Sequence, residues 1–136
     1  MSLMNAMDIL ATSLAAQRVR MNVASSNLAN ARTTRAENGE PYKRRDVVFS
    51  VAEVDEELGT AGVDIDDITE DQSAPKRVYD PGHPDADEEG YVMMPNIHLI
   101  EEMVNMITAS RAYEAGVSAM QQVTTMAERS LSIGKR

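Results

Sequence analysis

The sequence predicts a mainly α-helical protein with a small β-rich insert, in which long N- and C-terminal helices pair as a coiled coil. Two observations predict this fold class. Apolar residues recur at helical spacing near both ends, whereas most glycines and prolines and the acidic surplus lie between them. We therefore expect an amphipathic helix over residues 1–31, an outward-facing acidic β-rich insert over residues 32–95, and a second amphipathic helix over residues 96–136.

The N-terminal segment carries apolar side chains at alternating steps of three and four residues. This spacing puts them on one face of a helix and is the pattern of a coiled-coil seam. The residues assigned to this seam are Leu3, Met7, Leu10, Leu14, Met21 and Leu28. Gln17 and Ala24 complete the same face.

The C-terminal segment repeats this pattern. The residues assigned to its seam are Leu99, Met103, Met106, Tyr113, Val117, Met120 and Leu131, with Ser110 between them. We expect the helix to begin at Asn96, because an asparagine directly after Pro95 suits an N-cap.

The middle segment changes to short apolar runs that glycine and proline separate. These runs lie at residues 42–51, 63–68, 78–79 and 91–92, and they predict short strands joined by turns. Within residues 32–95, 17 acidic side chains outnumber 7 basic ones, so the insert is acidic and too charged for a large core. The basic residues Lys43, Arg44 and Arg45 stand beside Asp46, which favours an ion-paired strand or loop.

Each helix also carries a second, weaker stripe of small or β-branched residues. The stripe comprises Ile9, Ala16, Val19, Val23 and Ser26 in the first helix, and Ala112, Ala115, Ala119 and Met126 in the second. One seam can join the helices to each other, which leaves a second face without a partner in the chain. Either the hairpin packs loosely or these faces contact other helices. Gly116 favours contact with other helices, because a glycine inside a helix costs about 1 kcal/mol relative to alanine and invites close packing.

The composition excludes several classes of function. The net charge of -9 opposes binding to the phosphates of nucleic acid. No cysteine is present to form a disulfide or a thiolate metal site. No apolar run approaches the roughly 20 residues that cross a bilayer, so we expect no integral membrane protein. The first residues also lack the pattern of a cleavable signal peptide.

No group of residues predicts catalysis, a metal site or a cofactor site, and we expect none. The sequence has neither a nucleophile motif nor a glycine-rich phosphate loop. Asp85, Asp87 and Glu89 resemble the first ligands of an EF-hand, but Asn96 stands where the loop requires a bidentate glutamate. Glu102 near His98 is expected at an exposed helix start rather than in a metal site.

Four blocks of the sequence resemble bacterial flagellar rod and hook proteins. They read SSNLANARTT, PYKRRDVVF, YDPGHPDADEEGYVMMPN and EEMVNMITASRAYEAGV. Together they extend over nearly the whole chain except residues 52–76, and they are similar to the proximal-rod subunits of the flagellar basal body. Arg32 and Gly116 depart from the residues usual in that family.

This resemblance implies a structural subunit without enzymatic activity. Such a subunit is exported through the flagellar type III export apparatus without a cleaved signal peptide. It polymerises through its terminal helices, with copies of itself and other rod proteins, to transmit torque. The rod crosses the cell envelope, which includes a periplasm in a Gram-negative source. The alternative is a soluble helical adaptor or export chaperone whose acidic insert binds a basic client.

The resemblance also implies a role for the polar residues that end the first helix. Along a helix in the rod wall, they would exchange hydrogen bonds with a neighbouring subunit. These residues are Ser25, Asn27, Asn30, Thr33 and Thr34.

Overall fold

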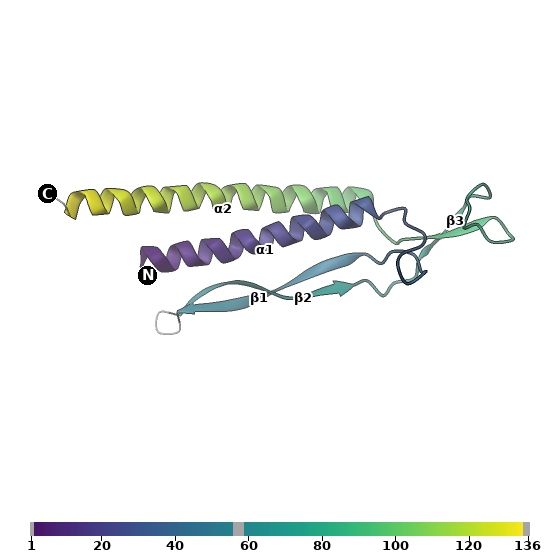
Figure 1. Cartoon of the computed structure of the whole chain (residues 1–136), viewed down its shortest axis with the longest axis horizontal. Coiled ribbons are helices and arrows are strands. Elements are labelled where there is room, and N and C mark those ends of the chain that lie inside the picture. The colour runs from purple at the N-terminus through teal and green to yellow at the C-terminus, as the bar shows by residue number, and fades with distance from the viewer. Residues whose placement is uncertain (1, 56–58, 135–136) are drawn as a thin grey trace.

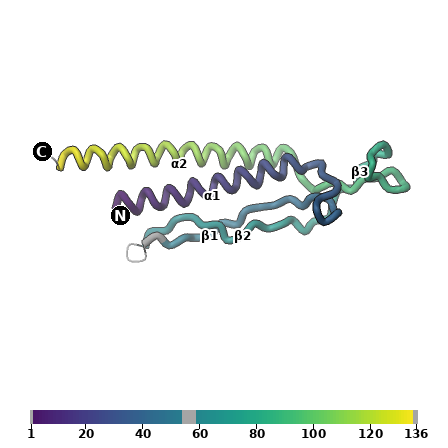
Figure 2. The backbone as a smooth tube through the Cα atoms, viewed as in Figure 1, coloured from purple at the N-terminus to yellow at the C-terminus, as the bar shows by residue number. Residues whose placement is uncertain are grey.

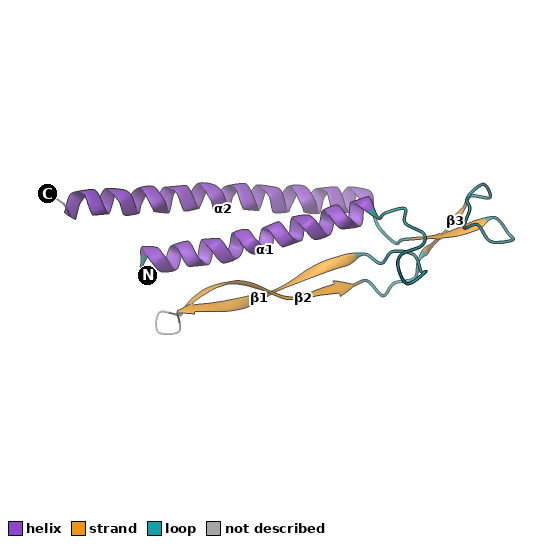
Figure 3. Ribbon diagram, viewed as in Figure 1, coloured by secondary structure: helices purple, strands orange, loops and turns teal. Residues whose placement is uncertain are grey.

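The computed structural model describes residues 2–55 and 59–134. In chain order, the elements are α1 (Leu3–Ala29), β1 (Arg45–Asp55), β2 (Thr60–Glu70), β3 (Lys76–Tyr79), β4 (Tyr91–Met94) and α2 (Leu99–Gly134). The two helices lie side by side and run antiparallel (Figure 1). The predicted class, mainly α with a β insert, is therefore confirmed, and Figure 3 shows the strands confined to the insert.

The first helix has well-defined caps at both ends. Ser2 is its N-cap, and the Ser2 hydroxyl accepts a hydrogen bond from the backbone N–H of Asn5 at 3.1 Å. At the other end, both the backbone N–H and the side-chain amide of Asn30 donate to the carbonyl of Ser26. The Ser26 carbonyl thus accepts both the last i→i−4 bond of the helix and a bond from the side chain of the C-cap residue, so α1 ends where the polar residues gather.

The strands form two separate antiparallel hairpins. β1 pairs with β2 over their whole length, with Val51 opposite Val63 and irregularities between Val48 and Phe49 and between Glu53 and Asp55. β3 pairs with β4, where Tyr79 lies opposite Tyr91 and the two rings meet edge to face. The β3–β4 hairpin contacts no other described element and lies at the far end of the molecule (Figure 1).

The β1–β2 hairpin lies alongside α1 on the side away from α2 (Figure 2). The hydroxyl of Thr12 accepts a hydrogen bond from the backbone N–H of Val63 in β2 at 3.1 Å, and Ala16 is buried. The second stripe of α1 therefore has a partner within the chain, and the expectation that it lacks one is wrong. The period of the helix reveals the stripe, but only the fold reveals that the insert turns back along it.

The two helices are in close contact at Gly116. A Cβ atom built there would lie 2.8 Å from Cδ2 of Leu14, which is closer than atoms in contact tolerate. Gly116 thus has the packing reason that its position in a helix predicts. The residue that packs against Gly116 is Leu14 in α1 of the same chain, whereas the sequence pattern favoured a helix of another subunit.

The buried face of α2 is turned slightly from the predicted seam. Its buried residues are Glu102 and Ala109, each one position before the predicted Met103 and Ser110. The helices pack closely where side chains are small or hydrogen-bonded, as at Ala109 and Glu102. The seam was predicted from apolar residues alone, so it missed these positions. The predicted start of this helix at Asn96 is wrong: α2 begins at Leu99, and the side-chain amide of Asn96 donates to the Ser73 hydroxyl at 2.8 Å.

Replacing Gly116 by leucine tests the close contact between the helices. We expect Gly116→Leu to lower the free energy of unfolding by about 1–3 kcal/mol, because the new side chain overlaps Leu14. Leu14→Ala added to this variant should recover part of the loss. The measurement is urea unfolding followed by circular dichroism. Gly134→Leu is the matched control, since no atom lies within 4 Å of a Cβ at that position. Equal effects of the two leucines would contradict the contact.

Candidate functional site

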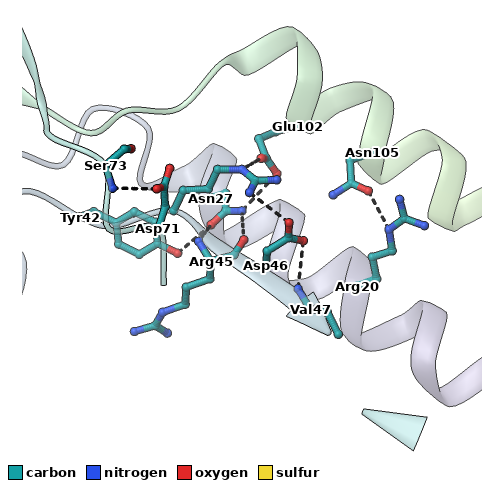
Figure 4. Close-up of polar contacts among 11 residues, drawn as sticks. Arg20, Asn27, Tyr42, Arg45, Asp46, Val47, Asp71, Ser73, Glu102 and Asn105 are labelled. Atoms are coloured by element: carbon teal, nitrogen blue, oxygen red, sulfur yellow. Dashed lines mark hydrogen bonds and ion pairs between the residues drawn. The ribbon is translucent and has the colours of Figure 1, made fainter. Parts of the chain in front are cut away.

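A buried polar network joins the end of α1, the segment that enters β1 and the first turn of α2 (Figure 4). Its centre consists of two side chains, Asn27 at 0% exposure and Glu102 at 1% exposure. Buried polar groups are costly unless they are hydrogen-bonded, so the partners of these two side chains decide whether the junction is stable.

The side-chain amide of Asn27 uses its full hydrogen-bonding capacity. Its nitrogen donates to the carbonyl of Arg45 at 2.7 Å and to the carboxylate of Glu102 at 3.1 Å. Its oxygen accepts from the backbone N–H of Arg45 at 2.9 Å and from the Tyr42 hydroxyl at 3.1 Å. The network fixes which way the amide points, because only this orientation matches every donor with an acceptor.

Glu102 is the buried negative charge of the network, and Arg44 is its counter-charge. Nε of Arg44 donates to Oε1 of Glu102, and another nitrogen of the guanidinium lies 3.2 Å from the carboxylate of Asp46. Partial burial acts to lower the pKa of Arg44, but hydrogen bonds and attraction from the two carboxylates outweigh it and raise that pKa above its ordinary value. The expected exposed position of Glu102 is wrong.

The basic residues Lys43, Arg44 and Arg45, around the start of β1, are ion-paired, as the neighbouring Asp46 in the sequence predicts. Arg44 bonds to Glu102 and Asp46, Arg45 lies 3.3 Å from Glu70, and Lys43 lies 3.8 Å from Glu40. Sequence reasoning found the basic cluster but missed its buried partner. Glu102 stands seven residues before Ala109 and shares its helix face, but the burial of both residues follows only from the fold.

The polar residues predicted to contact a neighbouring subunit bond mainly within the chain. Asn27 has no exposed atom to offer such a neighbour. The Thr33 hydroxyl donates to the side-chain oxygen of Asn30 at 3.1 Å, and the Thr34 hydroxyl donates to Asp85 at 2.7 Å. Ser25 is exposed. The structure therefore makes this region a junction between α1 and the insert.

The acidic turn before β4 is also engaged within the chain. Asp85 receives the Thr34 hydroxyl and lies 2.6 Å from Arg35, while Glu89 pairs with Arg77. Asp87 accepts bonds from the backbone N–H groups of Glu89 and Tyr91. Over residues 2–55 and 59–134, no group of three or more histidine, aspartate or glutamate side chains is placed to hold a metal ion.

The predicted seam residues divide into two groups. Nine of them are partly buried: Met7, Leu10, Leu14, Met21, Leu28, Met106, Tyr113, Val117 and Met120. The other four are exposed: Leu3, Leu99, Met103 and Leu131. No helix among the described residues is long and apolar enough to cross a membrane.

Comparisons with known proteins agree along almost the whole chain. A family model described as Flagella basal body rod protein matches residues 7–36, and another, Flagellar basal body rod FlgEFG protein C-terminal, matches residues 88–133. The flagellar basal-body rod protein FlgC of Escherichia coli O6:H1 is 44% identical over 99% of this chain and 100% of its own length. The chain belongs to the FlgC family of flagellar basal-body rod proteins.

The same family protein from distant bacteria matches equally well. FlgC of Bacillus subtilis strain 168 is 43% identical, and FlgC of Aquifex aeolicus is 42% identical, each over 99% of this chain. The sequence-based expectation of a structural protein of the flagellar rod is confirmed by this FlgC membership. The buried junction and the two helices are therefore parts of a rod protein.

Removing the Asn27 side chain tests the buried network. We expect Asn27→Ala to lower the free energy of unfolding by about 2–4 kcal/mol, because it leaves several buried polar groups without partners. Ser25→Ala, at an exposed position on the same helix, should change it by less than about 0.5 kcal/mol. The measurement is thermal or urea unfolding of the two variants. Equal free energies of unfolding would show that the network does not stabilise the protein.

The pKa of Asp85 provides a test of the link between Thr34 and the acidic turn. The Thr34 hydroxyl, followed by the charges of Arg35 and His83, lowers this pKa below its ordinary value of 3.8. A lowered pKa in the folded state stabilises the protein above pH 3.8, and this contribution disappears as the pH falls through the folded-state pKa. NMR titration of the carboxyl carbon should show the pKa rising toward 3.8 in Thr34→Val. An unchanged value would mean that this hydroxyl is not responsible, and Thr108→Val serves as control.

Proposed function

We propose that this chain is a structural subunit of the proximal rod that polymerises through α1 and α2 and transmits torque. The observation that carries this proposal is the match to FlgC proteins, which covers 99% of this chain and 100% of each relative. The adaptor alternative has no comparable support, because the matched relatives are rod proteins.

In this proposal, residues 1–31 and 96–136 form the rod core as a coiled coil, and residues 32–95 face outward. Two features of the fold support it. Leu14 and Met21 of α1 are partly buried, and Leu14 lies against Gly116 of α2. The acidic side chains of β2 are exposed along the hairpin, on the side of α1 away from α2.

The proposal also assigns partners and location. The chain assembles with copies of itself and other rod proteins in the basal body, after export through the flagellar type III apparatus without a cleaved signal peptide. In a Gram-negative source, this part of the rod lies in the periplasm. Ser25 and the exposed seam residues, Leu3, Leu99, Met103 and Leu131, are the predicted residues free to contact neighbours.

Sedimentation of purified basal bodies tests the function. The wild-type chain, tagged and expressed in cells that lack their own copy, should co-sediment with the particles. Leu14→Asp with Met21→Asp should reduce its incorporation by about tenfold or more, because each charge enters the contact between the helices. Met4→Asp on the same helix is the control, since Met4 is largely exposed. A stable wild-type chain that stays outside the particles would contradict the rod function and favour the adaptor.

A further inference from the structure

The acidic turn between β3 and β4, residues 80–90, is held against the segment that follows α1. The Asp85 carboxylate accepts a hydrogen bond from the Thr34 hydroxyl at 2.7 Å and lies 2.6 Å from a guanidinium nitrogen of Arg35. The β3–β4 hairpin contacts no other described helix or strand, and it lies at the far end of the molecule (Figure 1). Asp85 is therefore a polar link between this hairpin and the rest of the chain.

His83 fixes the backbone from which the Asp85 side chain extends. The backbone N–H of Asp85 donates a hydrogen bond to Nδ1 of His83 at 3.0 Å. The backbone N–H of His83 in turn donates to the carbonyl of Asp80 at 3.1 Å, and Pro84 restricts the backbone between His83 and Asp85. The position of Asp85 thus depends on a hydrogen-bond acceptor at Nδ1 of His83.

This acceptor exists only while the imidazole ring of His83 is neutral. A neutral ring has one nitrogen that donates and one that accepts, so acceptance at Nδ1 places the proton on Nε2. In a protonated ring both nitrogens are donors, and the proton on Nδ1 would face the N–H of Asp85. Histidine changes its charge between about pH 5 and pH 8, and His83 is only half-buried. Mild acid therefore removes this hydrogen bond.

The charges around His83 act in the same direction. A protonated ring attracts the Asp85 carboxylate and so competes for it with Arg35, the charged residue that lines the facing segment. A cleft of about 270 Å³ between the turn and this segment leaves room for the carboxylate to move. On β3, Arg77 pairs with the turn. The other ionisable residues of the turn are all acidic: Asp80, Asp87, Glu88 and Glu89.

Asp85 itself titrates at lower pH than a histidine does. Its pKa lies below the ordinary value of 3.8, because the bond from the Thr34 hydroxyl, and then the charges of Arg35 and His83, favour the carboxylate. The carboxylate therefore stays ionised throughout the range of about pH 5 to pH 8 in which histidine changes its charge. Any loss of the Asp85 contacts in that range is due to His83.

We propose that His83 is a pH-sensitive switch that keeps the acidic turn bound to Thr34 and Arg35 while its ring is neutral and releases the turn when the ring is protonated. The buried pair of Asn27 and Glu102 takes no part in these bonds, so the release leaves the helix junction intact. This inference goes beyond the rod function and does not depend on it, because the switch lies within a single chain.

Hydrogen exchange of the full chain, followed by NMR at about pH 8 and about pH 5, tests the switch. We expect the protection factor of the Asp85 amide to fall about tenfold at the lower pH, as the loss of one hydrogen bond predicts. The Asp71 amide, which donates to the Arg44 carbonyl outside the turn, should keep its protection.

His83→Asn is the matched variant, because an asparagine side chain accepts a backbone N–H two residues on but does not titrate. The Asp85 amide should be equally protected at both pH values in this variant. An equal loss of protection in His83→Asn, or no loss in the wild type, would overturn the proposal.

A distance measurement shows whether the turn itself moves. The sequence has no cysteine, so spin labels on Ser25→Cys and Glu88→Cys, both at exposed positions, mark α1 and the turn alone. The distance distribution should be narrow at about pH 8 and broad at about pH 5, but narrow at both when His83→Asn is added. Thr34→Val with Arg35→Ala removes both contacts to the turn and should broaden the distribution already at the higher pH. The switch is wrong if the distribution stays narrow in this double variant, or in the labelled chain without other changes at the lower pH.

Discussion

The hydrogen-bonded pair of Asn27 and Glu102 is the interaction on which the rest of the structure depends. Both side chains are buried, so each must keep its partners or lose stability on the order of 1–3 kcal/mol for every group left unpaired. Asn27 binds both backbone groups of Arg45, while Glu102 binds Arg44. One junction therefore fixes the end of α1, the start of β1 and the first turn of α2.

This junction also sets the register of the two helices. With Asn27 beside Glu102, the antiparallel arrangement brings Arg20 to Asn105, where Nε donates at 2.7 Å, and Leu14 to Gly116. A slip by one residue would bury the Glu102 carboxylate without its donors and would place a larger side chain against Leu14. The hydrogen bonds at one end of the helix pair and the close contact of Leu14 with Gly116 in the middle thus favour the same helix register.

The position of the insert determines which surfaces remain for assembly. Because the β1–β2 hairpin lies along α1, that helix is covered by the hairpin and by α2 (Figure 2). α2 contacts only α1 among the described elements, and it keeps apolar side chains exposed at both of its ends. The two helices look alike in sequence pattern, yet α1 lies between the hairpin and α2, whereas α2 has more exposed large apolar side chains than α1.

The sequence by itself determined the two helices, the strands of the insert and the family, because these depend on local spacing, turn residues and recognisable blocks. It also marked Gly116 as a packing position and residues 25–34 as special. Only the tertiary structure decided the partners. Asn27 bonds within the chain, Glu102 is buried, and the hairpin covers α1, because each of these depends on which distant segments meet. Periodicity in the sequence shows which faces of a helix are apolar. Whether a side chain is buried depends on which distant segment of the chain packs against it.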